Sequence, residues 1–168
     1  WLFSKCFSLR ETAYVTENSG VARRMLELAA AAAGAGGELS YGVSRRKKPA
    51  YRVALQDEDS RLRLLSAFGH TGGETSLRIN RAVLEDDCCQ VAFLRGAFLT
   101  CGTAADPQKG YHLEFAVPYQ KLANQLYTLL SEVTAFPVNP LLASRKGSYV
   151  VYWKESGQIE DLLTFLGA

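Results

Sequence analysis

The chain is poor in the residue types that serve metal binding and redox chemistry. Its 168 residues include two histidines, one methionine and four cysteines, which are Cys6, Cys88, Cys89 and Cys101. The cysteines show no C-x-x-C spacing, so they do not form a recognisable zinc site. No apolar run reaches the roughly 20 residues needed to span a bilayer. We therefore expect no membrane segment and no metal or other cofactor, and we expect reduced, buried thiols in a reducing cytoplasm.

An excess of charge of one sign is also missing, because 19 lysines and arginines face 17 aspartates and glutamates. The net charge of +2 is too small to indicate nucleic-acid binding, so the distribution of charge matters more than its sum. A hydrophobic content of 48% is enough for a sizeable core in one domain. Residues 1–10 lack a signal-peptide pattern. The first residue is Trp1 rather than methionine, so we expect further residues before Trp1.

The stretch that organises the chain is 87–102, with the sequence DCCQVAFLRGAFLTCG. Its apolar residues leave almost no polar face, which predicts a buried helix. Asp86 or Asp87 can cap the first turn, and Gly102 can end the helix in a left-handed turn. Gly96 and Thr100 stand four residues apart on one stripe, where small side chains allow a second helix to approach closely.

A second copy of this helix is predicted at the start of the chain. Leu2, Phe3 and Ser4 fall where Phe98, Leu99 and Thr100 stand, so residues 1–6 read as the last turns of the copy. The predicted interface between the two helices contains three small residues, Ser4, Gly96 and Thr100.

The remaining pattern describes two similar series of strands and helices. The first series predicts a strand over 7–15, a helix from a cap at 16–19 to Gly34, a hairpin of 39–43 with 51–56, and a helix over 57–68. After a connector with a possible strand at 77–80, the second series predicts strands over 111–117, 138–143 and 148–154 and helices over 119–133 and 158–166.

The two series are copies of one unit. Residues 51–69 align without a gap to residues 149–167, so that a tyrosine, a valine, a Leu-Leu pair and a glycine coincide. A period near 100 residues is too long for a solenoid repeat. We therefore predict two pseudo-symmetric halves, 1–69 and 87–168, which a connector over 70–86 joins.

The sequence also carries a family resemblance. Residues 94–102, LRGAFLTCG, resemble the LAGLIDADG helix motif of homing endonucleases. The sequences of four stretches are similar to the WhiA family of bacterial sporulation and cell-division transcription regulators, and the resemblance covers nearly the whole chain. These stretches are 16–24 (TENSGVARR), 88–99 (CCQVAFLRGAFL), 111–115 (YHLEF) and 145–163 (RKGSYVVYWKESGQIEDLL).

The resemblance implies an α/β (α+β) LAGLIDADG homing-endonuclease-like fold, with two αββαββα halves and paired central helices. It also implies that a C-terminal helix-turn-helix domain, absent after Ala168, carries most of the sequence-specific promoter binding. This N-terminal domain is then expected to contact double-stranded DNA weakly or to bind other transcription proteins. We expect a monomer in the cytoplasm, associated with the nucleoid.

The resemblance raises the question of nuclease activity. A LAGLIDADG nuclease needs a carboxylate at the C-terminal end of each central helix to bind divalent metals. Here these positions hold Lys5 and Cys101. Neither can bind the metal, because a lysine repels a cation and a thiol is too soft for magnesium. Asp106, in an Asp-Pro pair, reads as a turn residue. We expect no catalytic residue, no metal site and no enzyme activity.

Basic residues gather at the tips of the two predicted hairpins. The candidate DNA-binding residues are Arg45, Arg46, Lys47, Lys48, Arg52, Arg145 and Lys146. If both tips turn to one side, they flank a concave sheet surface and contact phosphates in a salt-sensitive way. Hairpin tips are also often basic only because they are solvated. Two other functions stay open: an active homing endonuclease, and an interaction scaffold without DNA binding.

Overall fold

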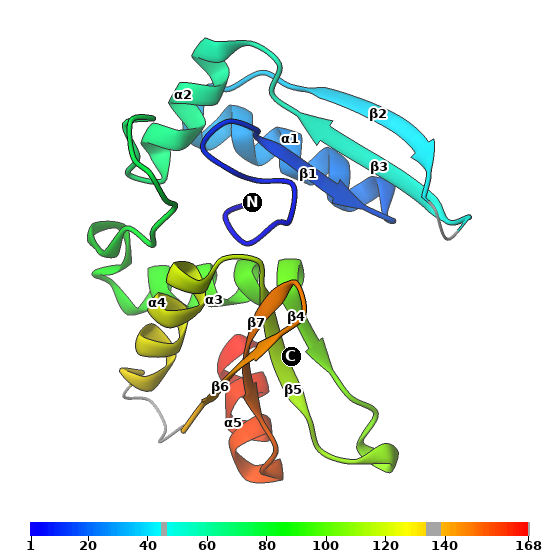
Figure 1. Ribbon diagram of the computed structural model, residues 1–168, viewed down its shortest axis with the longest axis vertical. Coiled ribbons are helices and arrows are strands. Elements are labelled where there is room, and N and C mark those ends of the chain that lie inside the picture. Colours follow the sequence, from blue (N-terminus) through cyan, green and yellow to red (C-terminus); the bar gives the residue numbers. More distant parts are fainter. Residues whose placement is uncertain (45–46, 134–138, 168) are drawn as a thin grey trace. The chain divides into compact units, whose positions relative to one another are not determined.

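The structure is a computed structural model that describes residues 1–44, 47–133 and 139–167 (Figure 1). The chain divides into two compact units, Trp1–Leu77 and Arg78–Ala168, and each has its own antiparallel sheet. The boundary between the units lies inside the stretch that we expected to be a connector. Within the described ranges, no helix combines the length and the apolarity that crossing a bilayer requires.

The first unit contains a three-stranded sheet of order β1-β3-β2 and two helices. The strands are β1 (Ala13–Thr16), β2 (Glu38–Val43) and β3 (Pro49–Ala54), and the helices are α1 (Ser19–Ala33) and α2 (Glu58–Ala67). The predicted hairpin is present as β2 and β3. The predicted strand over 7–15 is shorter, since only an isolated bridge between Phe7 and Thr12 precedes β1.

Helix α1 has the ends that its sequence predicts. The Asn18 side chain accepts hydrogen bonds from two backbone N–H groups of the first turn, and Gly34 ends the helix in the left-handed conformation with φ 59°. Ala22 of α1 packs with Tyr14 and Val53 in a buried cluster. Helix α1 therefore covers the side of the sheet that carries these two residues, and Arg52, next along β3, points to the other side.

The second unit contains a four-stranded sheet of order β4-β5-β7-β6. Its strands are β4 (Gly102–Ala104), β5 (Leu113–Val117), β6 (Leu141–Arg145) and β7 (Ser148–Trp153). Its helices are α3 (Asp87–Cys101), α4 (Gln120–Ser131) and α5 (Ser156–Leu166), and short 3-10 helices occur at η1 (Arg81–Leu84) and η2 (Pro107–Lys109). The predicted strand over 138–143 begins at 141, and Val138 lies outside the described residues.

The core of the second unit forms between the sheet and its helices. Phe115 of β5 makes edge-to-face contacts with Phe98 of α3, at 5.6 Å between ring centroids, and with Trp153 of β7, at 6.0 Å. Phe115 is fully buried and Trp153 almost fully. The residues that alternate with Phe115 on β5 and with Trp153 on β7 therefore point away from α3, because successive side chains of a strand point to opposite sides of the sheet.

The prediction of a fully buried α3 is wrong, since only Leu94 and Ala97 are buried and Leu99 is 82% exposed. Because the sequence of α3 is apolar on all sides, it does not indicate which side of the helix packs against other elements. Gly102 also does not adopt the left-handed conformation, because its φ is −83° and β4 starts there. A glycine is needed for a different reason: a Cβ at this position would overlap the Phe98 ring and lie 2.5 Å from the Phe98 carbonyl oxygen.

The strand registers show the internal repeat directly. In the first unit Thr16 lies opposite Tyr51, and in the second unit Val117 lies opposite Tyr149. A glycine with φ 77° stands at the end of each final helix: Gly69 comes one residue after the Phe68 cap of α2, and Gly167 itself caps α5. The gap-free alignment of residues 51–69 with 149–167 thus corresponds to equal strand pairing and to left-handed glycines at the same aligned position.

The predicted helix over residues 1–6 is not present. This stretch forms turns, with backbone hydrogen bonds from Ser4 to Trp1 and from Phe7 to Ser4, so Ser4 does not lie on a helix. Six residues are too few to offset the cost of helix nucleation, and Leu2 and Phe3 are buried instead. The possible strand over 77–80 is also absent, as this stretch pairs with no strand among the described residues.

We predict opposite stability effects for alanine at the two glycines of the α3 region. Gly102→Ala will lower the free energy of unfolding by about 2 kcal/mol, because its Cβ meets backbone that cannot move away freely. Gly96→Ala will raise it by about 0.5–1 kcal/mol, because within the second unit, apart from the neighbouring backbone of α3, no heavy atom lies within 4 Å of a Cβ at this position, and alanine favours helix.

Urea unfolding followed by circular dichroism measures both effects on the whole chain. A Gly102→Ala variant as stable as the parent protein would contradict the close packing of Phe98 on the start of β4.

Candidate nucleic-acid interface

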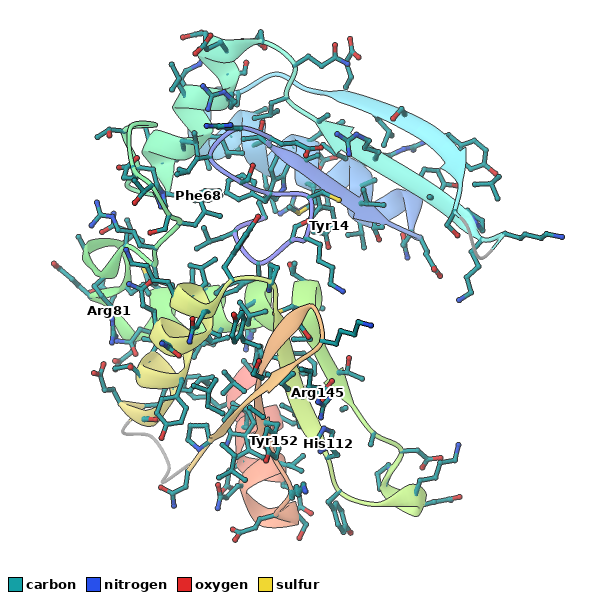
Figure 2. The ribbon with its side chains drawn as sticks, viewed as in Figure 1. Tyr14, Phe68, Arg81, His112, Arg145 and Tyr152 are labelled. Atoms are coloured by element: carbon teal, nitrogen blue, oxygen red, sulfur yellow. The ribbon has the colours of Figure 1, made fainter. Side chains whose placement is uncertain are left out.

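The side of the second unit's sheet that faces away from α3 carries a cluster of polar and aromatic side chains. We call this side the open face; it contains Glu114 and Tyr152, which lie opposite each other on the two central strands. His112, just before β5, and Lys154, just after β7, lie on the same side by alternation. Figure 2 shows His112, Tyr152 and Arg145 near one another over this sheet.

Glu114 is the centre of the cluster. Its Oε2 accepts a hydrogen bond from His112 Nε2 at 2.7 Å and lies 2.8 Å from Arg145 Nη1. Burial of Glu114, whose side chain is 17% exposed, raises its pKa, but the His112 hydrogen bond and the charge of Arg145 outweigh burial and leave that pKa below the usual value. Glu114 therefore holds Arg145 in place on the open face while half of the Arg145 side chain stays exposed.

Tyr152 lies between two cationic or polar neighbours. Its ring centroid is 5.7 Å from the centroid of the His112 ring, with 31° between the ring planes. Lys154 Nζ lies over the Tyr152 ring at 5.7 Å from the centroid, a cation–π contact. The open face thus combines an aromatic ring with the side chains of Lys154 and Arg145, two cations.

In the first unit, three of the predicted basic residues, Lys47, Lys48 and Arg52, lie on the hairpin of β2 and β3. Arg52 Nη2 is 2.7 Å from Glu11 Oε1, and Lys48 Nζ is 3.2 Å from Glu17 Oε2. Both pairs are largely exposed, and exposed pairs contribute only about 0–1 kcal/mol, so a phosphate can replace either carboxylate at little cost. Lys47 adopts a left-handed turn conformation with φ 58°, which is uncommon for a residue other than glycine.

The seven predicted DNA-binding residues therefore divide into three groups. Lys48, Arg52 and Arg145 each pair with a carboxylate. Lys47 and Lys146 are exposed in the turns, and their side chains make no ion pair within the described parts of the chain. Arg45 and Arg46 lie outside the described residues.

Of the three residues predicted to lie between two paired helices, only Gly96 and Thr100 lie on a helix. Thr100 Oγ1 donates to the Gly96 carbonyl at 2.9 Å, so this hydroxyl is used within α3. Gly96 is exposed, and Ser4 lies in a turn of the first unit, where its Oγ accepts a hydrogen bond from the Cys6 N–H. Which residues pack on the Gly96–Thr100 stripe stays a prediction.

The C-terminal end of α3 offers a thiol where a nuclease would need a carboxylate. Cys101 Sγ donates to the Ala97 carbonyl at 3.2 Å, and burial raises the pKa of this thiol to about 12, so it stays protonated at neutral pH. Asp106 caps η2 through the Gln108 N–H, as expected for a turn residue. Across the described ranges, no group of three or more histidine, cysteine, aspartate or glutamate side chains could hold a metal ion.

The cysteines are free, but the prediction that they are buried is wrong: Cys88 is exposed at the start of α3, and Cys6, Cys89 and Cys101 are only partly buried. The neighbouring Cys88 raises the pKa of the Cys89 thiol through a hydrogen bond. A raised pKa disfavours the reactive thiolate, which argues against redox chemistry at this pair.

Sequence reasoning missed Glu114, the residue that organises the open face. Its partner Arg145 lies 31 positions away in the chain, so spacing alone could not connect them. The available signal was the alternation in residues 112–117, where His112 and Glu114 interrupt the apolar row Leu113, Phe115 and Val117. Polar residues at every second position indicate the side of a strand that faces away from the core.

Comparison with known proteins gives consistent relatives. Residues 90–168 match the family described as the WhiA LAGLIDADG-like domain. A protein named probable cell division protein WhiA from Ruminiclostridium cellulolyticum is 36% identical over 99% of this chain and 53% of its own length. A protein of the same name from Clostridium botulinum is 33% identical over 91% of this chain and 50% of its own length. The chain thus spans about half the length of these relatives.

Solved structures show the same fold. Full-length WhiA from Thermatoga maritima matches with a TM-score of 0.67 and 19% identity, over 99% of this chain and 53% of that chain. The homing endonuclease I-DmoI, in complex with DNA and Mn, matches with a TM-score of 0.60 and 13% identity, over 94% of this chain and 81% of that chain. The fold is therefore the predicted α+β LAGLIDADG homing-endonuclease-like fold.

The lowered pKa of Glu114 predicts a pH-dependent contribution to stability. Because the folded-state pKa lies below its usual value of 4.5, ionised Glu114 stabilises the fold above that pH, and this contribution disappears as the pH falls through the folded-state pKa. Glu114→Gln will therefore lower the free energy of unfolding by roughly 1–2 kcal/mol at pH 7 and by progressively less in acid.

Urea unfolding of Glu114→Gln at several pH values measures the effect. Glu17→Gln, which removes an exposed ion pair with Lys48, serves as the control and should change stability little at any pH. A cost of Glu114→Gln that stays constant below pH 4 would contradict the ion-pair geometry.

Proposed function

The chain belongs to the WhiA family, in which it corresponds to the N-terminal LAGLIDADG-like domain, and on this basis we propose that it binds double-stranded DNA weakly without cleaving it. The proposal assigns DNA contacts to two surfaces, each within its own unit: the open face of the second unit and the β2–β3 hairpin of the first. Binding depends on contacts to phosphates and is only weakly sequence-specific.

The observation that carries the proposal is the position of Arg145. Glu114 holds its guanidinium on the open face, while Lys146 in the adjacent turn and Lys154 after β7 add positive charge to the same sheet. A guanidinium held by a carboxylate keeps donors available for phosphate oxygens. Further support comes from I-DmoI, which has the same fold and whose solved structure contains DNA.

The absence of cleavage is proposed from the end of α3. Two-metal hydrolysis needs hard oxygen ligands, and the neutral Cys101 thiol, bonded to the Ala97 carbonyl, supplies none. Lys5, in the corresponding place of the first unit's sequence, would repel a metal ion. The fold thus keeps a DNA-facing sheet without the carboxylates that a nuclease requires.

For the whole protein we propose a role in transcription control linked to cell division or sporulation, since the relatives are named probable cell division protein WhiA. In this proposal the rest of the protein contains a helix-turn-helix domain that selects the DNA sequence. The present domain, a monomer in the cytoplasm near the nucleoid, adds weak DNA contacts and provides a surface for other transcription proteins.

The proposal predicts salt-dependent binding to a short generic duplex, measured by fluorescence anisotropy between about 50 and 200 mM salt. The double variant Lys47→Glu, Lys146→Glu will bind more weakly and lower the slope of log affinity against log salt by about two. The double variant Arg23→Glu, Arg24→Glu is the matched control, because it changes the net charge equally at two exposed cations on α1 that lie on neither proposed surface.

The same samples with magnesium are then run on a denaturing gel. Intact strands are expected, whereas nicked strands would overturn the proposed lack of cleavage. No duplex binding at the lowest salt would overturn the DNA-binding proposal and leave an interaction scaffold. Equal loss of binding in the control variant would show that net charge, not the proposed surface, determines affinity.

A further inference from the structure

We propose that the open face of the second unit also binds single-stranded nucleic acid, with a base stacked on the ring of Tyr152. This inference rests on the nucleic-acid contact proposed above and specifies the form of nucleic acid that the face prefers. Paired bases in a duplex do not present their flat faces, so an aromatic ring on a sheet can stack only on an unpaired base.

The position of Tyr152 in the sheet favours such a contact. Tyr152 lies on β7 and pairs with Glu114 on β5, and these are the two central strands of the four-stranded sheet. Antiparallel sheets that bind single strands carry their stacking aromatics on central strands, because a base can then lie flat on the sheet while its phosphates reach the edges.

The surroundings of the ring are those of a stacking platform. Tyr152 is partly exposed, and the side of its ring that Lys154 Nζ covers at 5.7 Å borders an exposed side chain. An exposed cation–π contact is weaker than the stacking of a base, so a base displaces the lysine. The ammonium group of Lys154 is then free for the phosphate next to that base. The His112 ring, 5.7 Å from Tyr152, extends the platform.

Positive charge lies where the sugar-phosphate chain of such a strand would run. Arg145 Nη1 lies 2.8 Å from Glu114 Oε2 and offsets the charge of that carboxylate, so the carboxylate does not leave the face negative. Lys146 is exposed in the turn after β6. The strand would therefore pass from Lys154 across Tyr152 towards Arg145.

The first unit shows that the fold itself does not require this arrangement. By the register of the repeat, Ala54 corresponds to Tyr152, Ala13 to Glu114 and Gln56 to Lys154. These three residues line a cavity of about 580 Å³ in the first unit. The same sheet thus folds with alanine at the positions of Tyr152 and Glu114, which makes Tyr152 an addition specific to the second unit.

The experiment compares a labelled oligothymidine with a duplex of equal length by anisotropy, using the whole chain. We expect tighter binding of the oligothymidine. Tyr152→Ala will weaken oligothymidine binding by roughly 5- to 100-fold, a much larger factor than its effect on duplex binding, whereas Tyr152→Phe keeps the ring and most of the affinity. Tyr119→Ala, which removes a partly exposed tyrosine just before α4 and outside both proposed surfaces, is the matched control.

The outcomes separate this inference from the proposed function. Duplex binding without a preference for the oligothymidine overturns the stacking site and leaves the proposed function intact, and binding of neither probe overturns both. Equal weakening by Tyr152→Ala and Tyr152→Phe, or by Tyr152→Ala and Tyr119→Ala, also overturns the stacking site. Circular dichroism of each variant excludes unfolding as the cause.

Discussion

The structure depends on the antiparallel pairing of one central strand in each unit, β3 in the first and β7 in the second. Each of these strands pairs on both sides, so its register fixes which residues of three strands share a face. A shift by one position would exchange the buried and the solvent-facing rows of the sheet. Both the core around Phe115 and the cluster around Glu114 follow from this single register.

The sequence was informative wherever a local signal determines the structure. Asn18 and Gly34 mark the ends of α1 through their own hydrogen bonds and backbone preference, and the repeat predicted a second hairpin from the first. It was less informative about α3, since apolar residues on every side do not say which side is covered. It could not find the Glu114–Arg145 pair, because the two residues meet only through the order of strands in the sheet. The positions of the basic tip residues were predicted, but their carboxylate partners were not.

The proposed surfaces differ in how their charges are held. Lys48 and Arg52 belong to exposed pairs that exchange readily with solvent ions, whereas Arg145 is held by a carboxylate that is itself mostly buried. The first kind of surface provides affinity that falls steeply with salt. The second also fixes the direction of a donor group, which is what contact with one particular phosphate requires.

The equal registers of the two sheets have a consequence for folding. The rows that face the helices are interchangeable, because Tyr14 opposite Val53 in one unit matches Phe115 opposite Val151 in the other. Such repeats are prone to strand exchange between units or between molecules. The other rows do not allow the exchange so easily: β5 paired with β3 would place Glu114 opposite Ala54 and away from Arg145. Divergence between the two copies at these positions thus acts against misassembly, whatever else it serves.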